Sequence, residues 1–392
     1  MLSRFANTRK SISGALFAVV ALVMAACTPG GGPVSGGPSL DPGGAVAVAL
    51  LVPGGSGQAS DELLARSLQN AAQLAIADLG GVEIDLRVYN TAGQPGQAQA
   101  VALQAVEEGA LIILGPVFAQ EANAAGVAVA SQGVNVLSFS NNPDIAGRNV
   151  FVLGPTFTNT AQRLASYAVR NGKGRIMVVN DRNQAGSVGR AAVERGVRAA
   201  GGSVVAAADY EFSQSGVVQA APAIVQAARA NAADAIFLTA DTAGALPLVT
   251  QLLKESGLDP ATTQFLGLTR WDIPAATLAL PGVQGGWFAM PDPGLYAQFQ
   301  SRYQAAFGEA PHPIAGLAYD GIAAIGALVK QGKADALTAN ALTQNSGFAG
   351  VNGVFRLRSD GSNERGLAVA QIRNGQVVVI DPAPRSFAGA GF

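Results

Sequence analysis

Short apolar runs alternate along the chain with longer segments in which apolar residues recur every three or four positions. The run 45–52 (AVAVALLV) is typical of a buried strand, and leucine and alanine recur at helical spacing over 61–79 until two glycines end the pattern. The same patterns predict strands at 83–89, 111–114 and 134–139, and helices at 97–108 and 121–131. Strict alternation of strand and helix favours a parallel sheet with helices on both faces.

The alternation begins again after residue 155 and predicts a second doubly wound domain. Helices are expected at 160–170, 187–200, 217–230 and 243–255, and strands at 175–180, 204–208, 235–239 and 264–268. The remainder holds two predicted helices, 296–307 and 314–330, and three short strands near 353–357, 366–372 and 377–380. It is too short for a third α/β domain. We therefore expect it to complete the first two, with the chain crossing between them more than once.

The first residues have the layout of an export signal. Basic residues precede an uncharged stretch over 12–24, about 13 residues, which is too short to span a hydrocarbon core about 30 Å thick. Small residues then precede Cys27, the only cysteine, which cannot form an internal disulfide. The sequence Met-Ala-Ala-Cys resembles the lipobox of bacterial lipoproteins, which implies a lipid on Cys27. The alternative is an ordinary secretory signal, 1–26, with an incidental cysteine.

Composition limits the remaining possibilities. Residues 27–44 after the signal are almost all Gly, Pro, Ser and Thr, which predicts a flexible tether. The chain carries 25 Lys and Arg against 26 Asp and Glu, so there is no electrostatic basis for binding nucleic acid. About 350 residues follow the tether, enough for two domains. Beyond the leader, no stretch is long and apolar enough to cross a membrane, so the lipid is the expected membrane contact.

The sequence offers no catalytic constellation. The single histidine, His312, lies between two prolines, where a structural or exposed role is expected. No nucleophile elbow, P-loop or dinucleotide fingerprint occurs. One histidine and one cysteine leave no basis for zinc or thiol chemistry. We expect a non-enzymatic protein without cofactor or metal.

Four local motifs occur in an order and spacing that together resemble one known family. They are the segment 70–78 (NAAQLAIAD), Gly115-Pro116 after a short strand, 317–321 (LAYDG), and 350–356 (GVNGVFR) followed by Asp360-Gly361. Together they look like the Leu/Ile/Val-binding branch of the type 1 periplasmic binding proteins. The resemblance implies an α/β fold of two doubly wound parallel-sheet lobes with a three-segment hinge near 154–155, 290–291 and 358–360. It implies an N-terminal lobe of 45–154 with 290–358, and a C-terminal lobe of 155–289 with 359–384.

The resemblance also implies a ligand cleft between the lobes, at the carboxyl ends of the parallel strands. Helix N-termini at such an edge offer free N–H groups to a carboxylate. The cleft candidates in this sequence are Phe118, Ala119, Gln120, Ser140, Asn141, Asn142, Gln184, Asp241, Thr269, Arg270, Trp271 and Asp272.

Several residues with which the family holds an amino acid are missing at the matching places. The family's amino-acid binders hold the α-carboxylate through a Ser or Thr in each of two loops of the first lobe, which correspond here to 118–120 and 140–142. They hold the ammonium group through an acidic residue from the second lobe. Here Ala119 has no hydroxyl, Ala185 stands where an aromatic is frequent, and the acidic position falls near Thr269. Each lost charge-assisted hydrogen bond removes about 1.5–3 kcal/mol. Either the ligand differs, or the cleft no longer captures one.

Two functions therefore stay open. The first is a lipid-anchored binding protein that closes on a small polar ligand such as an amino acid and serves an ABC permease. The second is activation of a peptidoglycan synthase by contact. It is implied by a resemblance to the penicillin-binding protein activators, which are outer-membrane lipoproteins with this role. Thr28 stands where Asp would indicate inner-membrane retention, which favours a periplasmic protein held at the outer membrane.

Overall fold

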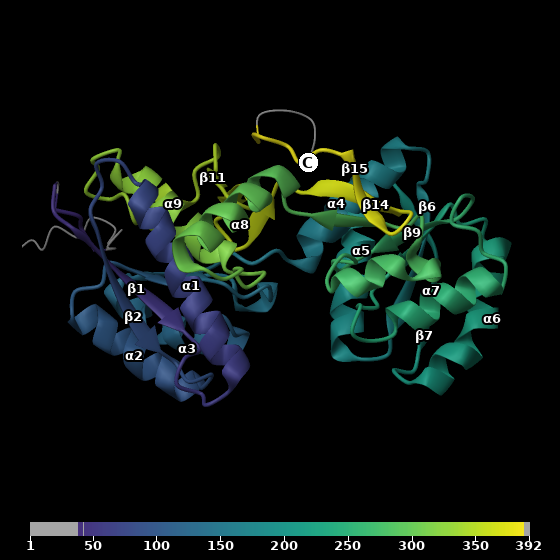
Figure 1. Ribbon diagram of the computed structural model, residues 1–392, viewed down its shortest axis with the longest axis horizontal. Helices are drawn as coiled ribbons and strands as arrows, with labels where there is room; N and C mark the ends of the chain where they lie inside the picture. Colours follow the sequence, from purple (N-terminus) through teal and green to yellow (C-terminus); the bar gives the residue numbers. More distant parts are fainter. Residues whose placement is uncertain (1–37, 42, 388–392) are drawn as a thin grey trace, which may run out of the picture. The chain divides into compact units, whose positions relative to one another are not determined.

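The computed structural model describes residues 38–41 and 43–387, which hold two large sheets and one small one (Figure 1). Cys27, the predicted leader 1–26 and most of the predicted tether lie outside these residues. Within the described part, no helix combines the length and apolarity that crossing a membrane requires.

The first sheet is entirely parallel, in the order β2-β1-β3-β4-β5. Its elements are β1 (Val46–Val52), α1 (Ala59–Asp78), β2 (Ile84–Asn90), α2 (Pro95–Glu107), β3 (Ile112–Leu114), α3 (Ala119–Val129), β4 (Asn135–Ser138) and β5 (Val150–Val152). Alternate residues of β1 enter two different cores. Val48 and Leu50 pack with α1, whereas Ala49 and Leu51 pack with α2 and α3. The continuous apolar run at 45–52 follows from this burial on both faces.

The second sheet has the order β15-β14-β10-β9-β8-β6-β7. Its first elements are α4 (Phe157–Arg170), β6 (Arg175–Asp181), α5 (Gln184–Ala199), β7 (Ser203–Tyr210), α6 (Gln214–Ala230), β8 (Ala235–Leu238), α7 (Leu246–Glu255), β9 (Gln264–Gly267) and β10 (Trp287–Met290). Strands β6 to β10 are parallel to one another. One core lies between this sheet and α4 and α5, and another lies on the side of α6 and α7.

The C-terminal part of the chain completes both lobes. Its elements are α8 (Pro293–Phe307), α9 (Gly316–Val329), α10 (Ala339–Leu342), β11 (Phe348–Gly350), β12 (Gly353–Leu357), β13 (Asn363–Arg365), β14 (Ala368–Arg373) and β15 (Gln376–Asp381). Helices α8 and α9 pack against α1, whereas β14 and β15 extend the second sheet as antiparallel strands. Strands β11, β12 and β13 form the small antiparallel sheet.

This connectivity confirms the predicted fold of two parallel-sheet lobes between which the chain crosses three times. The chain leaves the first sheet after β5, returns from β10 to α8, and leaves again from β12 through β13 to β14. The exact limits of the two domains stay a prediction.

The structure also holds elements that the pattern did not predict. Strands β5, β10, β11 and β13 have only three or four residues each, so periodicity gives little signal for them. The end of the predicted tether differs as well. Leu40 is only 7% exposed in the first core, and its N–H donates to the carbonyl of Ala334 at 2.9 Å. The ordered chain therefore begins before Ala45, because this apolar side chain is buried against the lobe.

Candidate functional site

The predicted cleft residues follow the carboxyl ends of strands in both large sheets. Phe118 to Gln120 come after β3, and Ser140 to Asn142 come after β4. In the second lobe, Gln184 follows β6, Asp241 follows β8, and 269–272 follows β9. The carboxyl edge of a parallel sheet is where open α/β folds place their ligands.

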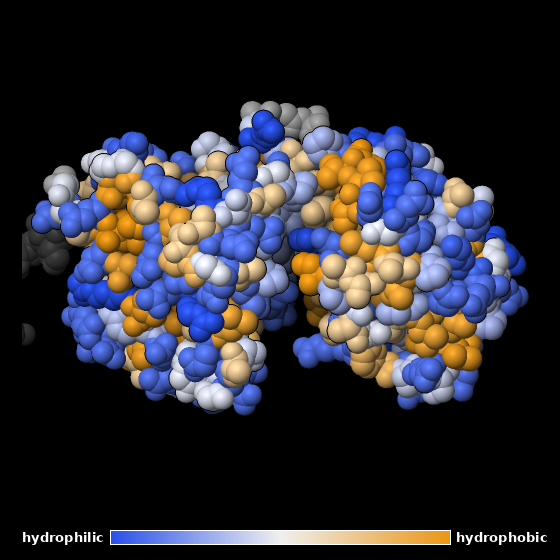
Figure 2. Space-filling view, in the orientation of Figure 1, coloured by the Kyte–Doolittle hydropathy of each residue, from blue (hydrophilic) through white to orange (hydrophobic). Residues whose placement is uncertain are grey.

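A cavity of about 260 Å³ lies where residues of both lobes meet the segments that cross between them. Three of the predicted residues, Asn141, Thr269 and Arg270, line it. Its other lining residues are Pro155, Thr156, Phe157, Thr160, Leu268, Ile273, Ala289, Met290, Pro291, Pro313, Ile314, Leu317, Asn352, Arg365 and Leu367. The surface in Figure 2 mixes apolar and polar side chains over both lobes, so exposed apolar residues alone do not locate a site. We take the cavity as the candidate site because it is mostly apolar and has a few polar groups in its lining.

Arg270 is held in a fork by Asp272. The Arg270 Nε lies 2.6 Å from Oδ1 of Asp272, and Nη2 pairs with Oδ2. The Arg270 side chain is 29% exposed and that of Asp272 is 12% exposed, so the pair is partly shielded from solvent. Nη1 of Arg270 makes no hydrogen bond to the described residues, and Arg270 is one of the residues that line the cavity. Nearby, burial raises the pKa of the Tyr296 hydroxyl, which donates to the carbonyl of Pro313 at 3.3 Å.

Other predicted residues lie near the carboxyl edges without lining the cavity. Phe118 and Gln120 are exposed at the start of α3, and Ala119 is half-buried. Ser140 is buried and its hydroxyl accepts from the N–H of Asn142, so both belong to a local turn. Gln184 and Asp241 are exposed in the second lobe. The structure does not bring these residues together with Arg270 around one cavity.

The prediction that Trp271 faces a ligand is wrong. Its side chain is fully buried in a core of the second lobe. Room for the indole is left by two glycines: a Cβ on Gly267 would lie 2.2 Å from the indole Nε1, and one on Gly286 would lie 2.1 Å from Cζ3. Arg270 therefore lines the cavity, while the next residue packs inward.

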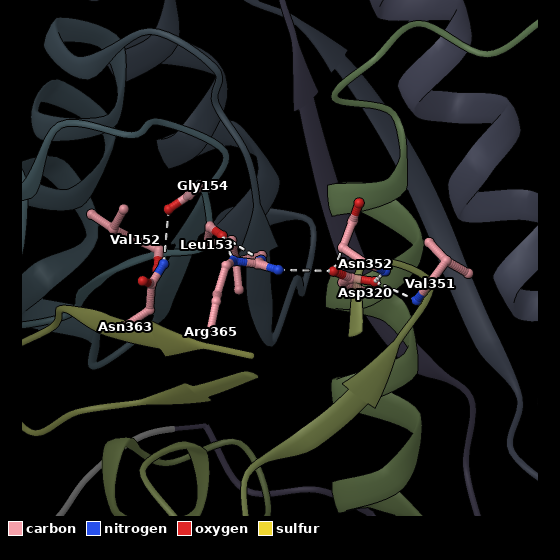
Figure 3. A network of polar contacts seen from close by, with 8 residues as sticks. All are labelled: Val152, Leu153, Gly154, Asp320, Val351, Asn352, Asn363 and Arg365. Atoms are coloured by element: carbon pink, nitrogen blue, oxygen red, sulfur yellow. Dashed lines mark hydrogen bonds and ion pairs between the residues drawn. The ribbon is translucent and has the colours of Figure 1, made fainter. Parts of the chain in front are cut away.

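A buried ion pair lies beside the cavity, and Figure 3 shows the guanidinium of Arg365 pointing to the carboxylate of Asp320. Arg365 Nη1 of β13 is 3.3 Å from Oδ2 of Asp320 on α9, and the two side chains are 2% and 0% exposed. The guanidinium also donates from Nε to the carbonyl of Leu153 at 2.8 Å. Oδ1 of Asp320 accepts from the N–H of Val351 at 2.8 Å, and Oδ2 accepts from Nδ2 of Asn352 at 3.0 Å.

These contacts satisfy two charges that burial would otherwise penalise. Burial raises the pKa of the Asp320 carboxyl, and the Arg365 guanidinium opposes that rise. Burial also lowers the pKa of Arg365, and Asp320 opposes this. Loss of one partner would leave the other as an uncompensated buried charge.

A second set of bonds ties β13 to the first crossing. Asn363 Nδ2 donates to the carbonyls of Val152 at 2.8 Å and Gly154 at 2.9 Å. Asn159 closes a capping box with Thr156 at the start of α4, and its Nδ2 donates to the carbonyl of Asn363 at 3.0 Å. Side chains from β13 and α4 therefore fix the backbone of the first crossing next to the cavity.

Sequence reasoning did not select Asp320, Asn352 or Arg365 as site residues, although Asp320 and Asn352 lie in segments that carried the family resemblance. A signal was present for Asp320, the only charged residue in α9. A lone charge within an apolar helix requires a partner, but the sequence does not say which residue supplies it.

His312, the single histidine, is held by hydrogen bonds. The N–H of His312 donates to Oγ of Ser67 at 2.7 Å, its Nδ1 accepts from the N–H of Ile314, and burial lowers the pKa of the imidazole. In the part of the chain that the structure describes, no three His, Cys, Asp or Glu side chains are arranged to hold a metal ion.

Comparison with known proteins identifies a family. A family model described as periplasmic binding protein matches residues 45–376. No functionally curated protein matches the chain in sequence.

Solved structures share the fold at low sequence identity. A protein of Rhodospirillum rubrum that carries the name of a branched-chain amino acid ABC transporter is 20% identical, with a TM-score of 0.72 over 86% of this chain and 100% of its own. A leucine-, isoleucine-, valine-, threonine- and alanine-binding protein from Brucella ovis, in a closed conformation, is 18% identical, with a TM-score of 0.64 over 88% of this chain and 93% of its own. A solute binding protein of an ABC transporter from Rhodopseudomonas palustris, in complex with 3,4-dihydroxybenzoic acid, is 20% identical, with a TM-score of 0.58 over 86% of this chain and 96% of its own.

Replacement of Arg365 by methionine should lower the free energy of unfolding by about 3–5 kcal/mol, because Asp320 is left buried without its counter-charge. Arg358→Met is the matched control. Arg358 pairs with Glu364 on the same hairpin. Its own side chain is 49% exposed and Glu364 keeps a second partner in Arg356, so loss of Arg358 should cost less than about 1 kcal/mol. Chemical denaturation measures both values.

The pH dependence separates the lost charge pair from lost packing. In Arg365→Met the pKa of Asp320 stays raised in the folded state, so the penalty is absent below the unfolded value of about 3.9 and grows as pH rises. Addition of Asp320→Asn should recover stability at pH 7.5 and little at pH 4. Equal recovery at both pH values would contradict the ion-pair explanation.

Proposed function

The chain belongs to the periplasmic binding protein family, and from this premise we propose that it captures a small organic solute between its two lobes for an ABC permease. The observation that carries the proposal is the cavity of about 260 Å³ lined from both lobes and from the crossings between them. Its volume lies near the lower end of ligand pockets, which suits a solute of about amino-acid size. A ligand at this place would favour a closed form only as far as it binds that form better.

The relatives support capture of a small solute without choosing one. The Brucella ovis protein is named for five amino acids, and the Rhodopseudomonas palustris protein holds an aromatic acid. The same fold therefore serves chemically different ligands, and the residues around the cavity must decide between them.

Calorimetric titration of the full chain with amino acids and small carboxylates tests solute capture. We expect saturable binding at one site, with a dissociation constant near the micromolar range, equivalent to about −8 kcal/mol. Thr160→Trp should weaken binding at least about tenfold, because Thr160 lines the cavity and the larger ring would fill it. Thr158→Trp is the matched control, since Thr158 lies in the same helical turn outside the lining. A flat response to the whole panel would remove solute capture.

We further propose that a lipid on Cys27 holds the protein at a membrane. The lipobox-like sequence supports this, and the described residues supply no spanning helix. Cys27→Ser should move the protein from the membrane to the soluble fraction of lysed cells, whereas Thr28→Ser should leave it membrane-bound. Thr28→Asp should shift it from the outer to the inner membrane in a density gradient. A Cys27→Ser protein that stays in the membrane would exclude the lipid anchor.

A second candidate function is contact activation of a peptidoglycan synthase. It is favoured by Ala119 at the start of α3, a helix with no side-chain cap, where the family's amino-acid binders supply a hydroxyl. A pull-down with bifunctional penicillin-binding proteins and a glycan-polymerisation assay test it. We expect binding and faster polymerisation if this function holds, and the absence of both would eliminate it.

A further inference from the structure

We propose that the cavity takes a monocarboxylate with an apolar body and no α-ammonium group, held through Nη1 of Arg270. The inference rests on the proposed function of solute capture and names the class of solute. Branched aliphatic acids and aryl-substituted acids of similar size belong to this class.

The lining of the cavity has no place for an ammonium group. None of the described residues that line it is Asp or Glu, and most of them are apolar. A cation placed there would lose its hydration without gaining a counter-charge, and an unpaired buried charge is strongly unfavourable.

Two carboxylates pair with arginines of the lining, and each of them is engaged by its partner. Asp272 accepts two bonds from Arg270, one to each carboxylate oxygen. Asp320 is fully buried and accepts from two backbone N–H groups, from the Asn352 amide and from Arg365. A carboxylate has about four lone-pair sites, so Asp320 has none left for a ligand.

Donors, in contrast, converge on the cavity. The bond pair with Asp272 fixes the plane of the Arg270 guanidinium and leaves both N–H groups of Nη1 unused. The planar fork of arginine suits a carboxylate, and its orientation here is set before a ligand arrives. The amide of Asn141, exposed on the first lobe, also has no hydrogen-bond partner among the described residues.

Two helices add a positive potential. Phe157 is the first residue of α4, and Leu317 lies in the first turn of α9; both line the cavity. Each helix has 14 residues, and the N-terminal end of a helix carries a partial positive charge. A negative group in the cavity is favoured by both ends, and a positive group is opposed by both.

Titration of the unaltered full chain with matched compounds tests the class. One series is 4-methylpentanoate, leucine and 4-methylpentanamide, and the other is 3-phenylpropanoate, phenylalanine and 3-phenylpropanamide. We expect the acid in at least one series to bind, with its amide about tenfold to 100-fold weaker because a charge-assisted hydrogen bond is lost. The amino acid of the same series should bind more weakly than the amide.

Arg270→Gln then locates the carboxylate. It should weaken the acid about tenfold to 100-fold and change amide binding less than about threefold, so that preference for the acid disappears. A general loss of structure would weaken both compounds. Arg182→Gln is the matched control, because Arg182 lies in the same lobe in an exposed pair with Asp209 and does not line the cavity.

The outcomes separate this inference from the proposed function. Leucine or phenylalanine binding as tightly as its acid would overturn the monocarboxylate class and leave solute capture standing. Acid and amide binding equally would overturn it in the same way. No binding of any of the six compounds would overturn the class and count against solute capture itself. If Arg270→Gln does not fold, the comparison on the unaltered protein decides alone.

Discussion

The arrangement of the lobes and cavity depends on one buried ion pair, Asp320 with Arg365. Asp320 belongs to α9, which packs on the first lobe, and Arg365 belongs to β13, which leads into the second. The pair is almost fully shielded from water, so its charges are tolerated only because each of them has further hydrogen-bond partners. Arg365, in the third crossing, donates to the carbonyl of Leu153 in the first crossing. Asp320, near the start of α9, accepts from the N–H of Val351 and from the amide of Asn352. The ion pair therefore connects two crossings with the N-terminal part of α9.

Such a pair adds little net stability compared with an apolar replacement, but it is demanding in geometry. Glycines around it show the same demand. A Cβ on Gly350 would lie 2.1 Å from Oδ1 of Asp320, and one on Gly316 would lie 2.7 Å from Nδ2 of Asn352. The backbone can approach the carboxylate this closely only where no side chain intervenes. Gly350 is therefore explained by the buried acid beside it.

The sequence predicted the fold further than the site. The segments 45–52 and 61–79 were predicted correctly as strand and helix. Burial of a strand on both faces gives a continuous apolar run, and burial of one stripe of a helix gives an apolar residue every three or four positions. Short strands such as β10 and β13 were not predicted, since three or four residues cover at most two periods of a strand, too few to stand out. For the site, three of the residues predicted from strand ends, Asn141, Thr269 and Arg270, line the cavity.

The rest of the site depends on tertiary contacts that no local pattern encodes. Trp271 was assigned to the cleft because its neighbours follow a strand, yet Gly267 and Gly286 leave room for its indole in the core. Asp320 and Arg365 are 45 residues apart in sequence, and their pairing follows only from the way α9 and β13 meet. Charge type along the chain can show that a buried residue needs a partner, but the fold decides which partner it has.

The position of the cavity connects ligand binding with the movement that the fold permits. Thr156 belongs to the first crossing, Met290 and Pro291 to the second, and Arg365 to the third, and all four line the cavity. A bound solute would therefore touch the segments whose backbone angles must change when lobes move. If the solute binds one lobe arrangement more tightly than another, it favours that arrangement through its contacts with these crossing segments. Because Arg365 is fixed by Asp320 and also donates to the carbonyl of Leu153, the first and third crossings are held together.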